Sequence, residues 1–154
     1  MFGKSEHVPG VIFDEDAIER NRKLGLPTNF IWFSDEKMSE LPEPVKNYIH
    51  LGELQNIHKR YKCRIREPWY SVPSVYATSL GMLKRSHDFP RLVFNKAQAY
   101  TTDTTYRVKH KKFNEATIVG SFINSLTALS AEIEGRHYGG GVLELVPSEI
   151  RKVL

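Results

Sequence analysis

The strongest folding signal in this chain is one apolar stripe between residues 115 and 134. Its apolar side chains recur at steps of three and four residues, which places them on one face of an α-helix. Asn114 suits the N-cap position and Gly135 suits the end of a helix. The pattern predicts one long helix over residues 115–134 whose stripe packs in the core: Ile118, Val119, Phe122, Ile123, Leu126, Leu129 and Ile133.

The segments before this helix predict an α+β fold. Two shorter helices are expected at residues 15–24, with Asp14 as N-cap, and at residues 45–54, after two prolines. The middle third combines strand-forming residues with Pro and Gly turn signals. We therefore expect a small mixed, mostly antiparallel sheet flanked by N-terminal helices and the long C-terminal helix. Its candidate strands, after a short entry strand at 8–13, are residues 61–66, 75–80, 91–94 and 104–109.

Positive charge is concentrated in the middle of the sequence. The formal net charge of the whole chain is +4, but residues 56–112 hold 13 Lys and Arg and only three acids. The flanking segments are net negative. Such an imbalance is typical of a surface that meets phosphates or another acidic partner.

The densest basic stretch is residues 58–70, HKRYKCRIREPWY, where cations alternate with aromatic and apolar residues. As a strand, it would present one charged face to a polyanion. A solvated edge strand, protected by its charges from pairing with another sheet, gives the same pattern. Trp69 and Tyr70 either stack on a ligand or pack in the core, and we favour the core for Trp69 because large aromatic side chains dominate protein interiors.

Several classes of site are disfavoured. The single cysteine, Cys63, forms no internal disulfide and rules out a zinc site built on paired cysteines. No histidine pair has metal-ligand spacing, so no metal site is expected. Asp14, Asp35 and Lys37 match a metal-dependent nuclease pattern only loosely. Without a signal peptide or a membrane-spanning apolar run, we expect a cytoplasmic protein that does not contact membranes.

Three consecutive glycines follow Arg136, His137 and Tyr138. Glycines allow close approach of a ligand to the backbone, and adjacent Arg and Tyr side chains add possible contacts. The alternative is a flexible linker between two helices. The run lacks the Lys-Ser/Thr ending of a phosphate loop and is not a dinucleotide fingerprint.

Two of these patterns belong to longer stretches that together resemble a known family. Arg66, Pro68, Trp69 and Tyr70 form an Arg-x-Pro-Trp-Tyr pattern, and residues 135–141 form a Gly-Arg-x-Tyr-Gly-Gly-Gly run. The chain is similar to the C-terminal target-recognition region of gamma-class adenine-N6 DNA methyltransferases of bacterial restriction–modification systems. The stretches that carry the resemblance are residues 11–27, 60–73, 89–100 and 125–150.

The resemblance implies a parent enzyme that transfers a methyl group from S-adenosylmethionine to N6 of a flipped adenine. In that family the cofactor site and the Asn-Pro-Pro-Tyr type catalytic loop lie in a separate domain upstream. The chain contains neither motif and no adjacent prolines. We therefore expect residues 1–154 to form one target-recognition domain without catalytic residues or cofactor of its own, acting with a catalytic methyltransferase domain.

Double-stranded DNA is then the expected partner. The alternatives are a basic RNA-binding module, a protein-interaction module without a methyltransferase partner, and the nuclease. Basic side chains would grip phosphates, while Arg, Lys, Asn or Gln would read base edges; Gln98 is one further candidate reader. The expected DNA-binding residues are Lys59, Arg60, Lys62, Arg64, Arg66, Lys84, Arg85, Asn95, Lys96, Arg107, Lys109, Lys111, Lys112, Arg136 and Tyr138.

Overall fold

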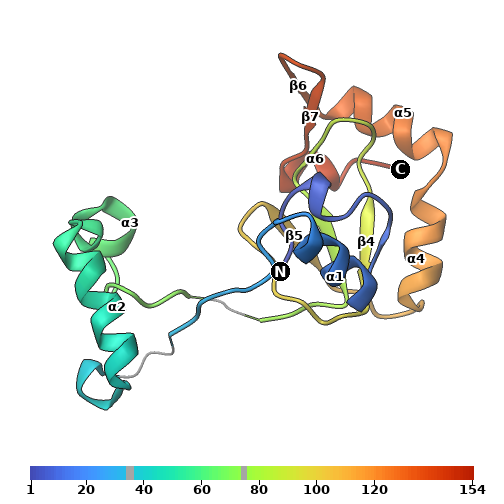
Figure 1. Ribbon diagram of the computed structural model, residues 1–154. Helices are drawn as coiled ribbons and strands as arrows, with labels where there is room; N and C mark the ends of the chain where they lie inside the picture. Colours follow the sequence, from blue (N-terminus) through green and yellow to red (C-terminus); the bar gives the residue numbers. More distant parts are fainter. Residues whose placement is uncertain (34–36, 74–75) are drawn as a thin grey trace. The chain divides into compact units, whose positions relative to one another are not determined.

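A computed structural model describes residues 1–33, 37–73 and 76–154 of the chain (Figure 1). The chain forms two compact units. The first, here called the sheet unit, combines Met1–Phe30 with Tyr76–Leu154. The second, here called the helical unit, is Ile31–Val75. Each unit is described by itself.

The main sheet of the sheet unit has the strand order β1-β4-β2-β5. Strand β2 (Leu80–Leu83) lies between β4 (Leu92–Asn95) and β5 (Thr105–Val108), antiparallel to both. Only the edge strand β1 (Ile12–Phe13) runs parallel to its neighbour, β4. The predicted α+β class with a mostly antiparallel sheet is therefore confirmed.

The sequence patterns predicted the positions of some strands of this sheet correctly and of others incorrectly. Those predicted at 91–94 and 104–109 are confirmed as β4 and β5, and the entry strand at 8–13 is reduced to β1. The prediction for 75–80 is wrong over residues 76–79, because β2 starts only at Leu80; Val75 itself lies outside the described residues.

A second antiparallel sheet has the order β3-β7-β6. It is formed by β3 (Arg85–Ser86), β7 (Val142–Glu144) and β6 (Arg136–Tyr138). Lys84 connects the two sheets, because its backbone N–H donates to Thr104 O at 2.9 Å and its carbonyl accepts from Leu145 N at 3.1 Å.

The two faces of the main sheet bury different clusters. Side chains alternate along a strand. Leu80 and Met82 of β2 accordingly join a core with Val119 and Ala131 of the C-terminal helices. Leu83 belongs instead to a core with Phe2, Val8, Phe13 and Val93, against which α1 packs. Both faces are thus covered, by α4 and α5 on one side and the N-terminal segment with α1 on the other.

The predicted single helix over 115–134 is wrong. The structure has α4 (Glu115–Phe122) and α5 (Ser125–Glu134), bent by 72° at the break (Figure 1). Asn124 is extended, and its side chain accepts from Thr127 N at 2.9 Å, so it caps a new helix. The stripe is consequently split, with Val119 buried and these members exposed: Ile123, Leu126, Leu129 and Ile133.

The other helices of the sheet unit are short and locally specified. Asp14 caps α1 (Glu15–Lys23) by accepting from Ala17 N at 3.1 Å, as predicted. The C-terminal helix α6 (Pro147–Ile150) has proline in its first turn. In the part of the chain that the structure describes, no single helix is long and apolar enough to cross a membrane; α4 and α5 reach that length and composition only together, as a bent pair.

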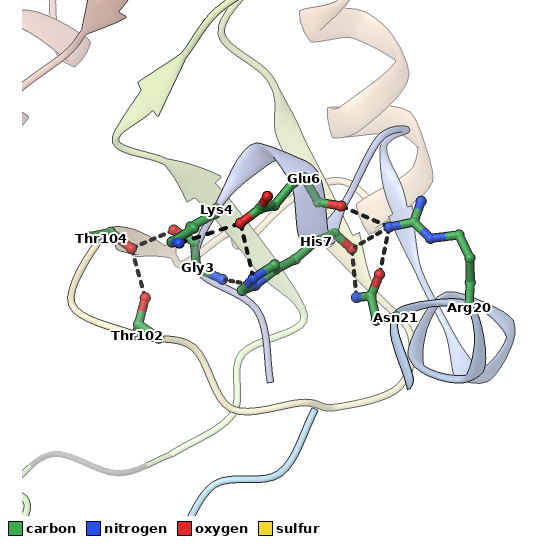
Figure 2. Close-up of polar contacts among 8 residues, drawn as sticks. All are labelled: Gly3, Lys4, Glu6, His7, Arg20, Asn21, Thr102 and Thr104. Carbon is green, nitrogen blue, oxygen red and sulfur yellow. Dashed lines mark hydrogen bonds and ion pairs between the residues drawn. The ribbon is translucent and has the colours of Figure 1, made fainter. Parts of the chain in front are cut away.

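The N-terminal turn is the single-turn 3-10 helix Ser5–His7 together with Gly3 and Lys4. Polar contacts join it to the rest of the sheet unit (Figure 2). The buried His7 accepts from Gly3 N through Nδ1 at 3.3 Å, while its carbonyl accepts from Asn21 Nδ2 at 2.9 Å. On the other side, Thr104 donates to the Gly3 carbonyl. Burial is the main cause that lowers the pKa of His7, so its neutral form is favoured inside this network.

The helical unit consists of α2 (Glu43–Leu54), α3 (Tyr61–Arg64) and two single-turn 3-10 helices, Met38–Glu40 and Ile57–Lys59. The helix predicted at 45–54 is confirmed as α2. The strand predicted at 61–66 is wrong, because α3 occupies this position. Among its described residues this unit has no strand that could pair with it, and alternating charge alone does not stabilise an extended chain.

Candidate nucleic-acid interface

The helical unit presents one concentrated group of cations. Lys59, Arg60, Lys62 and Arg64 are all exposed, on the turn before α3 and on α3 itself. Over residues 58–66 there are five Lys and Arg and no acid. The arrangement is a helical turn rather than the flat strand face predicted, but it places the cations of these four residues where phosphates can reach them.

Arg66 differs from its neighbours. It is half-buried and donates from Nη1 to the Ser71 carbonyl at 3.0 Å. Nearby, Trp69 is also half-buried and donates from Nε1 to Glu53 Oε1 at 3.2 Å. Hydrogen bonds from His50, first, and then from Trp69 hold the pKa of Glu53 below its usual range. Arg66 and Trp69 therefore help to organise the unit, and neither lies in a fully buried core.

In the sheet unit, Lys84 and Arg85 face the same buried carboxylate. Glu144 is 4% exposed and lies 3.1 Å from Lys84 Nζ and 2.5 Å from Arg85 Nε. The hydrogen bond from Arg85 is the largest cause that lowers the pKa of Glu144. Both cations are thus partly neutralised inside the protein, which weakens their field toward an external phosphate.

Asn95 is fully buried at the end of β4. Its amide nitrogen donates to the carbonyls of Thr78 and Ala99, both at 2.8 Å, and its amide oxygen accepts from Ala99 N at 3.0 Å. The side-chain amide of Asn95 is therefore engaged in hydrogen bonds inside the sheet unit. Its exposed neighbour Lys96 lies over the ring of Phe94, with 5.5 Å from Nζ to the ring centroid.

Arg107 on β5 is held in one orientation. Its guanidinium carbon lies 3.9 Å from the centroid of the Tyr76 ring, and its Nε donates to Thr101 Oγ1 at 3.3 Å. A stacked and hydrogen-bonded guanidinium is pre-organised for planar recognition. The segment that leaves β5 then exposes three lysines: Lys109, Lys111 and Lys112.

The glycine run forms the turn of a β-hairpin between β6 and β7, and not a linker between helices. Gly140 and Gly141 have φ values of 80° and 73°, which favour glycine. Tyr138 is 51% exposed before the turn. Arg136 is already paired, with 2.6 Å from its Nε to Glu149 Oε1. A hairpin was detectable from the two short strand-forming segments around the glycines.

Tyr138 and Arg85 also line an open cavity of about 720 Å³. The N-terminal turn closes its other side with Lys4 and Glu6, and His87 contributes a further titratable group. The cavity was not predicted from the sequence, because its walls come from segments distributed between Gly3 and Val142. No group of three His, Cys, Asp or Glu side chains within the described ranges is arranged to hold a metal ion, and Asp35 of the nuclease pattern lies outside them.

Comparison with known families gives a match over the whole chain. The model described as the C-terminal domain of the Type II methyltransferase M.Eco57I matches residues 1–154. The chain therefore belongs to this family of methyltransferase C-terminal domains, and the resemblance to the recognition region of restriction–modification methyltransferases is confirmed. No curated protein and no solved structure matches the chain.

Proposed function

We propose that this chain grips duplex DNA as the target-recognition part of a site-specific adenine-N6 DNA methyltransferase. Membership of a methyltransferase C-terminal family supports a role beside a catalytic domain. The observation that carries the DNA contact is a set of exposed cations in each unit. They are Lys59, Arg60, Lys62 and Arg64 in the helical unit and Lys109, Lys111 and Lys112 in the sheet unit.

The mechanism follows from base flipping. A methyltransferase must extrude its target base from the stack, so the duplex has to be held while the base is out. In this proposal the exposed lysines and arginines neutralise phosphates and fix the register. Arg107, pre-oriented on Tyr76, reads a base edge, and Tyr138 on the hairpin is a second candidate. Asn95 is left out of the readers because its amide groups are engaged by the backbone.

The chemistry is assigned to the parent enzyme. S-adenosylmethionine and the catalytic side chains would be supplied by the partner domain, and this chain alone would transfer no methyl group. Incubating the chain with duplex DNA and labelled S-adenosylmethionine tests this point directly. Incorporation of label into adenine would contradict it.

Salt dependence tests the DNA grip itself. If six or more phosphates are neutralised, affinity for a duplex should fall by about 10³-fold or more between 50 and 200 mM salt. An exposed cation outside the proposed set supplies the control, because Lys23→Ala on α1 should leave the slope unchanged. A slope near zero, or tighter binding to single-stranded RNA than to duplex DNA, would remove the proposal.

A second candidate function, contact with a protein, is favoured by the exposed apolar face of α5. Leu126, Leu129 and Ile133 are each at least 59% exposed and lie at helical spacing. Such a patch is typical of a surface covered by another protein. The two functions are compatible, because a recognition domain has to be joined to a catalytic one.

A further inference from the structure

The helical unit contains an aromatic pocket that the phosphate grip does not use. Its volume is about 490 Å³, within the range of small-molecule sites. Four aromatic rings line it, together with aliphatic side chains of α2, Cys63 and Arg66. The cavity is here called the aromatic pocket, and its four ring residues are Phe33, Tyr48, Trp69 and Tyr70.

The rings of the aromatic pocket are placed at angles to one another. Phe33 lies 6.0 Å from Tyr48 and 6.3 Å from Tyr70 between ring centroids, the latter pair nearly perpendicular. Trp69 and Tyr70 are 5.9 Å apart and also edge-to-face. The rings do not stack face to face on each other, and all four line the pocket, so a planar guest inside it would lie against aromatic walls.

The unit holds this arrangement through specific contacts. A Cβ added to Gly52 of α2 would lie 2.7 Å from Cη2 of Trp69, so the tryptophan ring lies directly against the helix backbone. Its Nε1 is fixed by Glu53 at 3.2 Å. Arg66, which lines the pocket, is fixed in turn by the Ser71 carbonyl. The pocket is therefore built by both ends of the unit's sequence and not by one flexible loop.

Charge identifies the kind of guest. The segment between α2 and the aromatic pair, residues 55–68, contains five cations and one acid, Glu67. Cys63 and Arg66 belong to this segment and also line the pocket, while Lys59, Arg60, Lys62 and Arg64 are exposed and lie close to them in the sequence. An aromatic cavity bordered by cations fits a planar ring attached to phosphates.

We propose that the aromatic pocket binds a nucleobase that lies outside the duplex stack, while residues 58–66 bind the phosphates next to it. The inference rests on the proposed function, since it requires nucleic acid as the partner, and it adds a site for the base itself. Paired bases are excluded because their faces are already stacked. Aromatic stacking accepts any base, so the pocket adds affinity and not sequence selectivity.

Fluorescence offers a direct test, because the chain has only two tryptophans, Trp32 and Trp69. In the whole chain carrying Trp32→Phe, Trp69 reports alone. A single-stranded 12-nucleotide DNA should quench its emission, whereas an abasic strand of equal length should bind residues 58–66 without quenching. Tyr48→Ala, at a 55% exposed lining position, should weaken binding of the base-containing strand about 5- to 150-fold and leave the abasic strand unchanged.

Leu54→Ala is the matched control, since Leu54 is an 80% exposed apolar residue of α2 that neither lines the pocket nor belongs to residues 58–66. A second measurement needs no substitution in the pocket: the rate at which a maleimide alkylates Cys63 in the wild-type chain. The base-containing strand should slow this labelling more than the abasic strand does. A duplex with one mismatched pair, compared with a perfect duplex, distinguishes an extruded base from a single-stranded end.

The outcomes separate this inference from the proposed function. One outcome is salt-dependent binding of duplex DNA together with equal affinity and equal quenching for the base-containing and abasic strands. This outcome would overturn the base site and leave the phosphate grip intact. An equal loss in Tyr48→Ala and Leu54→Ala would also overturn it. Absence of binding to any nucleic acid would overturn both proposals and assign the pocket to a protein contact.

Discussion

Glu144 accepts a hydrogen bond from Arg85 across the second sheet, with 2.5 Å between Oε2 and Nε, although the two residues are 59 positions apart. The carboxylate is almost fully buried, and the guanidinium is largely exposed. This pair decides how Arg85 behaves. A cation predicted from the sequence to contact DNA is committed first to an internal carboxylate.

The pair between Arg85 and Glu144 makes the free energy of unfolding depend on pH in the acid range. The hydrogen bond from Arg85 lowers the pKa of Glu144 in the folded protein below its unfolded value near 4.3. The stabilisation is therefore present above the unfolded pKa and is lost as pH falls through the folded pKa. Thermal unfolding between pH 7 and pH 3 should show a midpoint that drops in acid. Glu144→Gln should lower the midpoint at pH 7 and flatten its acid dependence.

The control for this prediction is Glu132→Gln. The carboxylate of Glu132 forms an exposed pair with His137, at 3.5 Å, and exposed pairs contribute little. Its substitution should leave both the midpoint and its pH dependence nearly unchanged. Equal effects of the two substitutions would show that the buried pair has no special contribution.

Asn95→Ala should destabilise the sheet unit without acting on DNA. The substitution leaves the carbonyls of Thr78 and Ala99 and the N–H of Ala99 without their partner. We expect the free energy of unfolding to fall by on the order of 3 kcal/mol, since each buried group left unsatisfied costs about 1–3 kcal/mol. Urea unfolding measures this. The neighbouring exposed Lys96→Ala should change it by no more than about 0.5 kcal/mol.

The lysines after β5 should set part of the salt dependence. Replacing Lys109, Lys111 and Lys112 together by alanine should reduce the slope of log affinity against log salt by about 3, one for each phosphate that is no longer neutralised. Fluorescence anisotropy with a labelled duplex provides the measurement. Arg85→Ala should reduce the slope less, because Glu144 already neutralises that cation. A larger reduction of the slope in Arg85→Ala than in the triple lysine variant would contradict the view that Arg85 is neutralised and the three lysines are available.

Arg107 should affect selectivity more than affinity. Stacked on Tyr76 and bonded to Thr101, it is the proposed reader of a base edge. If that base is guanine, Arg107→Ala should lose discrimination at one base pair by about 1–3 kcal/mol. Arg107→Lys should not restore it, because lysine lacks the planar fork. Selection from a randomised duplex pool reveals the lost position. Uniform weakening over all sequences, as expected for Lys111→Ala, would instead assign Arg107 to phosphate.

Local sequence signals predicted the elements that are locally specified. Asp14 and Asn114 were identified as N-caps because their side chains reach backbone N–H groups three residues away. The break between α4 and α5 was missed because the apolar stripe was given more weight than Asn124, whose capping signal lies within it. Once the axis bends, a different face of α5 meets the core that buries Val119, so Ala131 is buried there while Leu126, Leu129 and Ile133 are exposed.

Non-local contacts account for what the sequence did not predict about the site. Nothing near Arg85 indicates that Glu144 will neutralise it, and nothing near Asn95 indicates three hydrogen bonds inside a loop. Cation counts therefore predicted the basic surface but not which members are available to DNA. The helical conformation of residues 61–64 was missed for a related reason, since a strand requires a partner strand that a local pattern does not show.

Two helical glycines provide the last prediction, because their surroundings differ. Gly120 in α4 has nothing within 4 Å of an added Cβ, whereas at Gly52 in α2 that atom would lie 2.7 Å from the Trp69 ring. Gly120→Ala should stabilise the chain by up to about 1 kcal/mol, as alanine does in helices. Gly52→Ala should be destabilising, by about 1–3 kcal/mol, because the ring has to move.

Both variants are measured by urea unfolding, followed by circular dichroism for Gly120→Ala and by tryptophan emission for Gly52→Ala. Trp32 and Trp69 both lie in the helical unit, so emission reports on that unit. The displaced ring should also shift the emission spectrum of folded Gly52→Ala. If this variant were as stable as Gly120→Ala with unchanged emission, Trp69 would have room to move, and the close packing that builds the aromatic pocket against α2 would be wrong.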